Sequence, residues 1–315
     1  MKLIRVVAMV FLLVFELVSF ARAPRVEGNR LPSKPFISGD GFRAIADHIY
    51  DETDKSLSAD EIAYADIVFV KSDYLNDFLQ KIHPYIINTY ILISHNSDSP
   101  APGKFVDLLY DPKILRWYGQ NPTIAFHEKF VPIPIGVGNR YTSHGADVRH
   151  FIEAFNYQQK VLKRSCIVGL NFHVGNNVDA RKFVFDYFSD KSFVKRIFSG
   201  DHFGYMNNMA HAKFILSPPG NGLDCHRTWE ALIAGSIPIL ITSDMNELLE
   251  DLPVLIVDKW QDVNIDMLKK AYDEFQQKKE HYKLGKIYFD FWHDLLKKEQ
   301  LRFRKQKGGG NEDLL

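Results

Sequence analysis

Apolar residues follow two alternating patterns along the chain. Short uninterrupted runs of Val, Ile, Leu and Phe alternate with segments in which apolar residues recur every three or four positions. The first pattern indicates strands buried on both faces, and the second indicates helices with one apolar side. Strands or extended segments are expected at residues 35–38, 66–71, 89–94, 123–126 and 130–136, and then at residues 165–172, 213–217, 237–242 and 253–258.

Helical spacing lies between these runs. It predicts helices at residues 42–51, 73–82, 104–119, 180–189, 224–234 and 266–304. Ser72 and Pro84 are suitable start and stop residues for the second of these helices, and Pro112 interrupts the third.

Two successive series of strands and helices predict an α/β fold with two Rossmann-like domains that face a cleft. The length of 315 residues suits two domains of ordinary size. We expect an N-terminal domain at residues 24–160, a C-terminal domain at residues 161–305 and a disordered tail at residues 306–315. Ligands of such sheets bind beyond the carboxyl ends of the strands.

The first 23 residues differ from the rest of the chain. Lys2 and Arg5 precede an apolar run at residues 6–20, which is followed by the sequence Ala-Arg-Ala. This order is typical of a secretory signal, and the run is short for a membrane-spanning helix. We interpret residues 1–23 as a cleaved signal peptide or, as a second choice, an uncleaved anchor. Both place the remaining chain in the secretory pathway or at a membrane.

The composition gives no indication of a nucleic-acid partner. The chain has 39 basic and 39 acidic residues, so no net field attracts a polyanion. The basic stretch at residues 297–307 is interpreted as a solvated helix end rather than a membrane-surface patch. Cys166 and Cys225 are too few for a disulfide framework, and we interpret them as buried thiols rather than a bridge.

The segment SPPGNGLDCHRTWEALIAGSIPI, residues 217–239, reads as strand end, loop, helix and strand. Gly220 and Gly222 flank Asn221, and the missing Cβ atoms are expected to let a ligand approach the loop backbone. Asp224 is a suitable N-cap for the helix. Because a helix start presents unpaired N–H groups and a partial positive charge, this position is suited to an anion.

Arg227 and Glu230 lie three positions apart on this helix, so they can share a face. A guanidinium in the first turn suits phosphate oxygens, and a carboxylate one turn further can accept two ribose hydroxyl protons. The set therefore predicts a nucleotide site. The alternative is an Arg–Glu ion pair on a helix surface beside an ordinary glycine turn, and spacing alone does not separate the two.

The string KFILSPPGNGLDCHRTWEALIAGSIPILI, followed by LPVLIVDKW, resembles the C-terminal motif of exostosin-type glycosyltransferases, family 47 and relatives. In that motif a small residue, Pro and Gly precede an Arg, then Glu-Ala, then Gly-x-Ile-Pro-Val/Ile. The matching residues are Ser217, Pro219, Gly220, Arg227, Glu230, Ala231, Gly235, Ile237, Pro238 and Ile239, and the trailing pair is Asp258 and Trp260. The resemblance covers roughly residues 203–260.

The resemblance implies a glycosyltransferase with two Rossmann-like domains, the architecture called GT-B. The C-terminal domain would bind a nucleotide-sugar donor, a UDP- or GDP-sugar, and the N-terminal domain a glycan acceptor. Arg227 would contact the donor diphosphate, and Glu230 the ribose. In such enzymes the loop after the first C-terminal strand commonly reaches the donor phosphates, which makes Asn171 and Arg181 candidates; Arg181 could instead be a solvated helix residue.

Transfer with inversion needs a base that removes the acceptor hydroxyl proton. His95 and Asp98 follow the strand expected at residues 89–94, and Asp40 precedes the helix expected at residues 42–51. We expect catalytic or acceptor-binding roles for these three residues, with ordinary polar turns as the alternative. His226 is interpreted as a packing or capping residue.

The sequence contains no Asp-x-Asp pair, with which metal-dependent sugar transferases usually hold a divalent cation. Arg227 and the helix start can supply the positive potential instead, so we predict that no metal or other cofactor is required. The function expected from the sequence is transfer of a sugar from a nucleotide sugar to a glycan hydroxyl. The alternatives are a non-catalytic nucleotide- or glycan-binding module of the same fold and, more weakly, a secreted interaction protein.

Overall fold

The structure is a computed structural model that describes residues 30–158, 160 and 164–308. The signal or anchor expected at residues 1–23 lies outside the described residues. Of the expected disordered tail, residues 306–308 are the last residues of a helix, and residues 309–315 lie outside the described part. Within the described ranges, no helix combines the length and the apolar character needed to cross a membrane.

The N-terminal half forms a five-stranded sheet in which all neighbouring strands are parallel and follow the order of the chain. Its strands are β1 (His48–Tyr50), β2 (Ile67–Lys71), β3 (Tyr90–His95), β4 (Ile114–Gly119) and β5 (Phe130–Pro132). The segments around and between them form α2 (Gly39–Ile45), η1 (Ala59–Glu61), η2 (Ser72–Tyr74), α3 (Leu75–Lys81), η3 (His83–Tyr85) and η4 (Gly103–Tyr110).

The C-terminal half forms a second parallel five-stranded sheet, in the order β10-β9-β8-β6-β7. Its strands are β6 (Cys166–Leu170), β7 (Val194–Arg196), β8 (Ala212–Leu216), β9 (Ile237–Ile241) and β10 (Leu255–Val257). The strand order reverses between β6 and β8. In open parallel sheets such a reversal creates a crevice at the carboxyl ends of the two strands, and ligands bind there.

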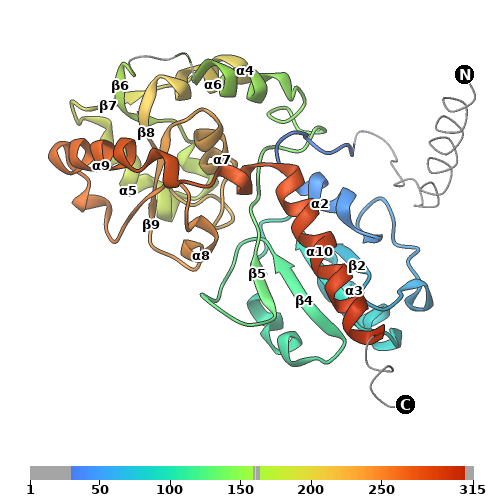
Figure 1. Cartoon of the computed structure of the whole chain (residues 1–315). Helices are drawn as coiled ribbons and strands as arrows, with labels where there is room; N and C mark the ends of the chain where they lie inside the picture. Colours follow the sequence, from blue (N-terminus) through green and yellow to red (C-terminus); the bar gives the residue numbers. More distant parts are fainter. Residues whose placement is uncertain (1–29, 159, 161–163, 309–315) are drawn as a thin grey trace, which may run out of the picture.

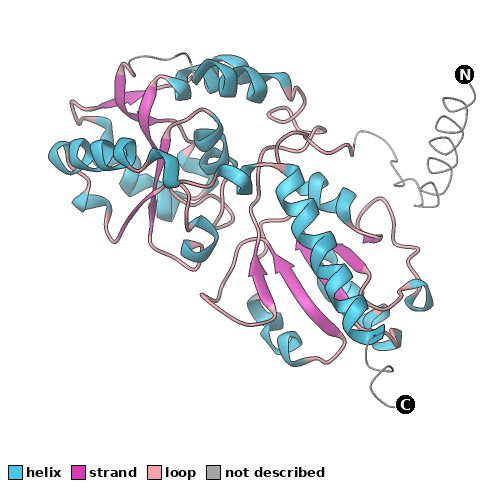
Figure 2. Cartoon of the chain, viewed as in Figure 1, coloured by secondary structure: helices cyan, strands magenta, loops and turns pink. Residues whose placement is uncertain are grey.

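Helices surround this second sheet and return to the first one (Figure 1; Figure 2). They are α4 (Arg149–Gln158), α5 (Val178–Ser189), α6 (His202–Ala210), α7 (His226–Ile233), α8 (Asn246–Leu249), α9 (Ile265–Gln277) and α10 (Phe289–Gly308), with the short turns η5 (Val174–Asn176), η6 (Trp260–Asp262), η7 (Lys279–His281) and η8 (Leu284–Ile287).

Each sheet is buried on both faces, as uninterrupted apolar strands require. On β2, Ile67 and Phe69 belong to one core while Val68 and Val70 belong to another, because successive side chains point to opposite faces. The first core also contains residues of α2, α4, α6, α7, β8 and α10, so it is shared by both halves of the chain. Separate cores lie beneath α3 in the N-terminal half and beneath α5 and α9 in the C-terminal half.

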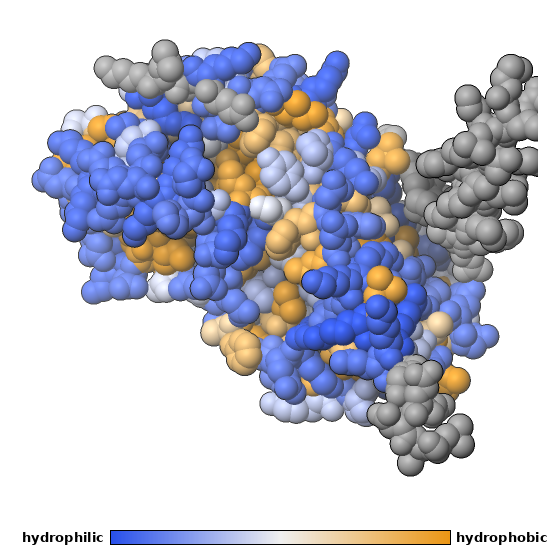
Figure 3. Space-filling view, in the orientation of Figure 1, coloured by the Kyte–Doolittle hydropathy of each residue, from blue (hydrophilic) through white to orange (hydrophobic). Residues whose placement is uncertain are grey.

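Helix α10 packs on the N-terminal sheet although it is the last element of the chain (Figure 1). Trp292 and Leu296 lie in the shared core, and the Gln300 side chain donates to the carbonyl of Ala65 at 3.0 Å. Conversely, α4 packs against α6 and α7 of the C-terminal half. The last helix before the division expected at residue 160, α4, thus packs on the C-terminal half, and the last helix of the chain, α10, packs on the N-terminal half. The visible outer face of α10 is mostly hydrophilic (Figure 3).

Most of the expected strands are present, although residues 123–126 form none, and three expected helices are wrong in part. The helix expected at residues 266–304 is two helices, α9 and α10, separated by η7 and η8. The helix expected at residues 42–51 ends at Ile45, and residues 48–50 form β1 beside β2. The helix expected at residues 104–119 is a 3-10 segment followed by β4. In the last two cases sheet pairing with a buried neighbour outweighs a local pattern that fitted a helix. The result is an α/β protein with two parallel five-stranded sheets, compatible with two Rossmann-like domains.

Candidate functional site between the two sheets

Arg181 of α5 holds the loop from β8 to α7 in place through hydrogen bonds. The guanidinium of Arg181 donates to the carbonyl of Pro219 at 2.8 Å and to the carbonyl of His173 at 2.9 Å, and the residue is 3% exposed. Asn177 donates to the carbonyl of Gly220 at 2.7 Å. Arg181 is therefore neither a solvated helix residue nor free to bind phosphate with these donors: it fixes the shape of the loop.

The two loop glycines make room for other parts of the chain. A Cβ atom on Gly220 would lie 2.9 Å from Nη2 of Arg181, and one on Gly222 would lie 2.6 Å from Nδ2 of Asn121. We expected this space to admit a ligand, but at both positions a side chain of the protein occupies it. The glycines thus let α5 and the N-terminal half approach the loop closely.

Asp224 is not the N-cap of α7. The cap position belongs to Cys225, and the helix begins at His226. The Asp224 carboxylate instead accepts hydrogen bonds from the backbone N–H of Ile135 at 2.7 Å and from Nε1 of Trp229 at 2.8 Å. Because Ile135 belongs to the N-terminal half, Asp224 joins the helix tip to the other sheet. Burial raises the pKa of Asp224 to about 7, although these donors act in the opposite direction.

Two further hydrogen bonds connect the tip of α7 to the N-terminal half. The backbone N–H of Asp224 donates to Oδ1 of Asn121 at 2.9 Å. Nδ1 of His226 lies 2.7 Å from the carbonyl oxygen of Gly136. Since a carbonyl oxygen can only accept, Nδ1 of His226 carries the proton in this contact. The start of α7 therefore lies directly at the junction of the two halves.

Arg227 lies at this junction without a counterion among the described residues. Its Nε donates to the carbonyl of Asn171 at 2.8 Å, and its guanidinium lies 5.4 Å from the ring centroid of Phe172. Its Nη1 is buried and has no hydrogen-bond partner within the described part of the chain. An unpaired guanidinium nitrogen away from water is costly unless an acceptor is supplied from outside.

Glu230 does not pair with Arg227. One of its carboxylate oxygens accepts from the Tyr205 hydroxyl at 2.7 Å, and the other lies 3.7 Å from Nε2 of His202. Burial raises the pKa of Glu230, but His202, His226 and the Tyr205 hydroxyl outweigh burial, and the pKa is lowered. The carboxylate is therefore ionised and faces α6. The surface Arg–Glu ion pair, the alternative from the sequence, is absent from the described structure.

Asn171, Arg227 and Glu230 gather where the strand order reverses. Asn171 follows β6 directly, its side chain donates to the carbonyl of Ile197 at 3.1 Å, and its own carbonyl holds Arg227. The loop after β8 leads to α7, which carries the other two residues. Three of the expected donor-binding residues are thus brought together at the crevice between β6 and β8.

Asn221 and Gly222 lie on another side of the same loop. They line a cavity of about 530 Å³, the loop cavity, between the two halves. The remaining walls come from the ends of β9 and β4 and from the segment after β3, and they comprise Leu223, Thr242, Ser243, Asp244, Asp98, Pro100, Asn121, Pro122 and Thr123. The expected donor residues therefore form two groups rather than one continuous surface.

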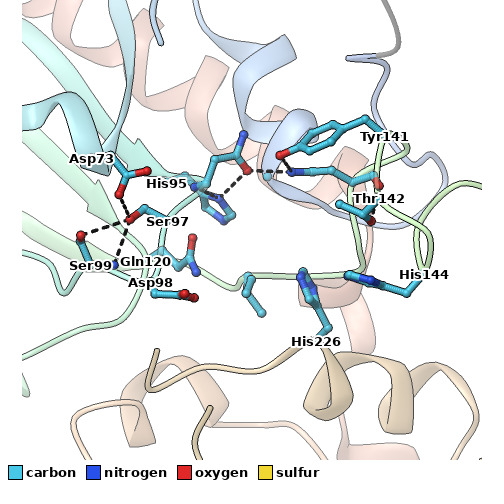
Figure 4. Close-up of a pocket in the computed structure, with 14 residues that line it drawn as sticks. Asp73, His95, Ser97, Asp98, Ser99, Gln120, Tyr141, Thr142, His144 and His226 are labelled. Carbon is cyan, nitrogen blue, oxygen red and sulfur yellow. Dashed lines mark hydrogen bonds between the residues drawn. The ribbon is translucent and has the colours of Figure 1, made fainter. Parts of the chain in front are cut away.

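A second cavity of about 410 Å³, the central cavity, lies beyond the carboxyl ends of the N-terminal strands (Figure 4). Asp98 lines both cavities, is exposed and makes no hydrogen bond or ion pair with any described residue. Figure 4 shows His226 and His144 on the side of this cavity opposite the segment that carries Asp98. The free carboxylate of Asp98 is therefore placed between the two halves.

His95 lines the central cavity but both of its ring nitrogens are occupied. Nε2 donates to the carbonyl of Pro134 at 2.9 Å, and Nδ1 accepts from the backbone N–H of Asn96 at 2.6 Å. Burial lowers the pKa of His95 to about 4, so the ring is neutral. Because no lone pair is left over, the geometry argues against the catalytic role expected for His95.

The carboxylate oxygens of Asp40 are also occupied by hydrogen bonds within the protein. It is fully buried and accepts from Nε and Nη2 of Arg30, at 3.0 and 2.9 Å, and from the Asn96 side chain at 3.0 Å. This arrangement holds the start of α2 against the loop after β3. The structure gives Asp40 a positioning contact instead of the catalytic role expected from the sequence.

Sequence reasoning missed three residues at the junction, Gln120, Asn121 and His144, and it interpreted a fourth, His226, as a packing or capping residue. Gln120 is 1% exposed and lines the central cavity, and its side-chain oxygen has no hydrogen-bond partner in the described structure. It follows β4 directly. Had residues 114–119 been interpreted as a strand, the position of Gln120 at its carboxyl end would have indicated a site residue.

The comparisons with known proteins add no identification: no family model and no curated protein sequence matches this chain. The described residues contain no group of three or more His, Cys, Asp or Glu side chains arranged to hold a metal ion.

Proposed function

We propose that the chain is a glycosyltransferase that moves a sugar from a nucleotide-sugar donor to a hydroxyl group of a glycan. Its two parallel sheets would be the two Rossmann-like domains of a GT-B enzyme. The support is the coincidence of three features at one place: a strand-order reversal, the start of a helix, and a buried guanidinium nitrogen that has no acceptor among the described residues.

The unsatisfied guanidinium of Arg227 is the observation that carries this proposal. Its Nη1 is buried without a partner, and the neighbouring carboxylate on the same helix is turned to Tyr205 and His202. The backbone N–H groups of His226 and Arg227 make no hydrogen bond within the described chain. A diphosphate would supply acceptors for all of these donors and would meet the partial positive charge of the helix.

The other groups follow from this placement of the diphosphate. Glu230 is ionised and lies one turn further along α7. Its Oε1 lies 3.7 Å from Nε2 of His202 and would accept hydrogen bonds from the ribose hydroxyls. Transfer creates negative charge on the leaving UDP or GDP. Arg227 and the helix start would stabilise that charge without a bound metal.

The acceptor would enter the central cavity. Asp98 is the remaining base from the N-terminal half, because His95 and Asp40 are held by other contacts. The same observation favours one alternative, a non-catalytic nucleotide- or glycan-binding module, since two of three expected candidates are unavailable for proton transfer.

Donor binding followed by product analysis tests the proposal. The full chain is titrated with UDP and GDP and then incubated with a panel of nucleotide sugars and glycan acceptors, with product mass as the readout. Arg227→Ala should weaken nucleoside diphosphate binding roughly 10- to 100-fold, the loss of one or two charge-assisted hydrogen bonds. Arg302→Ala is the control, because the Arg302 guanidinium also lies over an aromatic ring, 4.9 Å from Phe303, but on α10.

The outcomes separate the hypotheses. Nucleotide binding together with a glycosylated product supports the enzyme. Nucleotide binding without any product across the panel supports the binding module. Equal nucleotide affinity of wild type and Arg227→Ala would contradict the assigned role of Arg227.

A further inference from the structure

His226 combines a fixed ring with a free nitrogen. Its Nδ1–H is donated to the carbonyl of Gly136 at 2.7 Å, which sets the orientation and the tautomer of the neutral imidazole. Nε2 then carries a lone pair, and it makes no hydrogen bond with any described residue. The ring lines the central cavity (Figure 4). A backbone carbonyl thus holds this imidazole in the state that can accept a proton.

The position of His226 in the chain connects the two parts of the proposed site. It is the first residue of α7 and precedes Arg227, so its ring is fixed relative to the proposed diphosphate position. Asp98 belongs to the opposite half and is exposed, and its side chain makes no hydrogen bond with any residue that the structure describes. Of these two groups, His226 is therefore the one whose side chain is held in a single orientation.

The lining of the central cavity suits a neutral polyhydroxyl ligand. None of the described residues that line it is Lys or Arg, whereas it contains carboxylate, amide, hydroxyl and imidazole groups. The buried side-chain oxygen of Gln120 has no hydrogen-bond partner within the described part of the chain, and a sugar hydroxyl could donate to it. Gln120 lies on the same side of the cavity as Asp98, and the His226 ring forms part of the facing wall (Figure 4).

We propose that His226 is the general base of the transfer reaction; this inference rests on the proposed function. Nε2 takes the proton of the acceptor hydroxyl as the acceptor oxygen bonds to the anomeric carbon of the donor sugar. The bond from that carbon to the diphosphate oxygen breaks, and its electron pair leaves with the nucleoside diphosphate. The imidazolium then returns its proton to water.

The groups that face His226 determine how it responds to protonation. The Glu230 carboxylate lies one turn along α7, and attraction between the two contributes to the lowered pKa of Glu230. The His144 ring lies 5.1 Å away between ring centroids, and burial and repulsion by His226 lower the pKa of His144. His95, on the N-terminal side, is neutral with a pKa of about 4. An imidazolium that forms at His226 during transfer would therefore face one carboxylate, that of Glu230, and two imidazoles with lowered pKa values, those of His144 and His95.

The variant His226→Asn distinguishes a role of His226 as a base from a role as a structural contact to Gly136. The Asn side-chain N–H₂ can take over the bond of Nδ1 to Gly136, but Asn has no counterpart of Nε2. The transfer rate should fall about 100-fold or more, the usual contribution of general-base catalysis. Nucleoside diphosphate affinity and melting temperature should stay close to wild type, and the acidic limb of the pH profile of kcat/KM should disappear. His293→Asn, on the surface of α10, is the control and should match wild type.

The transfer rate of Asp98→Asn is measured in the same assay as that of His226→Asn. A full rate in His226→Asn, or a loss confined to Asp98→Asn, would overturn the assignment while leaving the glycosyltransferase intact. Absence of transfer by wild type with every donor would reject the proposed function and the role of His226 together. If His226→Asn does not fold, His226→Gly with added imidazole replaces it; restoration of transfer by imidazole supports the base, and no restoration contradicts it.

Discussion

Asn121 and Asp224, from opposite halves of the chain, are joined by a hydrogen bond in which Oδ1 of Asn121 accepts the backbone N–H of Asp224 at 2.9 Å. Asn121 also fills the space beside Gly222, and its backbone has a φ of 55°. A single side chain therefore fixes the distance between the loop before α7 and the end of β4.

Asn121→Ala should destabilise the protein by about 2 kcal/mol. The buried N–H of Asp224 loses its acceptor, and alanine is less suited than asparagine to positive φ. Denaturant unfolding measures the effect. Asn221→Ala is the control. Asn221 lies in the loop between β8 and α7, as Asp224 does, but it is exposed and its side chain makes no hydrogen bond in the described structure. Equal stability of the two variants would show that the contact is unimportant.

Gly222→Ala should lower the melting temperature, because the new Cβ atom would lie 2.6 Å from Nδ2 of Asn121. Overpacking of this kind costs roughly 1–3 kcal/mol. Gly175→Ala tests the same substitution where no atom lies within 4 Å, and its melting temperature should match wild type or exceed it. A shift of equal size in both variants would refute the close approach of the two halves at Gly222.

Asp224 should make stability fall as the pH rises from about 4 to about 7. Its pKa is raised from 3.8 to about 7, so in this range the native state holds a proton that the unfolded state has lost. The slope is up to about 1.4 kcal/mol per pH unit. Other carboxyl groups contribute as well, so the quantity to measure is the unfolding free energy of wild type minus that of Asp224→Asn.

That difference should decrease over this range. A difference that is flat or increases for Asp224 would mean that its carboxylate is ionised throughout and stabilised by its hydrogen bonds.

Trp292→Ala should be among the most destabilising changes in α10, by about 3–5 kcal/mol. Trp292 is 2% exposed, packs 5.6 Å from the ring centroid of Phe42 and donates from Nε1 to the carbonyl of Lys286. Phe291→Ala removes the neighbouring aromatic side chain, which is 37% exposed, and should cost much less. A comparable loss in both would indicate that α10 does not pack on the N-terminal sheet by the face described.

Arg227→Lys should recover only part of the nucleotide affinity lost in Arg227→Ala. Lysine keeps the charge, but its single nitrogen cannot both donate to Asn171 as Nε does and present a second donor from the position of Nη1. Calorimetric titration with UDP and GDP compares the three proteins. Full affinity in Arg227→Lys would mean that charge alone is recognised.

The sequence predicted the fold best where the strands are central. The strands β2, β3, β8 and β9 each contain an uninterrupted apolar run, and a run buried on both faces has few alternatives. The errors lie where polar residues interrupt a strand: Arg116 lies within β4, and its side chain reaches Glu299 of α10 at 3.0 Å. The edge strand β7 includes Lys195 and Arg196 and has no apolar run to reveal it.

The candidate site was predictable only in part, for a related reason. Arg227 and Glu230 could be selected because their spacing along one helix is a local property. The occupation of His95 and Asp40 depends on Pro134 and Arg30, which become neighbours only after folding. The bond from His226 to Gly136 joins segments 90 positions apart in the sequence, so the local pattern gave no indication of it and favoured a packing role.

The exchange of α4 and α10 means that the backbone passes between the halves twice, once before Arg149 and once before Phe289. A protease cut in the loop at residues 137–148 would therefore leave one particle instead of two fragments that diffuse apart. Complete separation of the two sheets would therefore require α4 or α10 to leave the elements on which it packs.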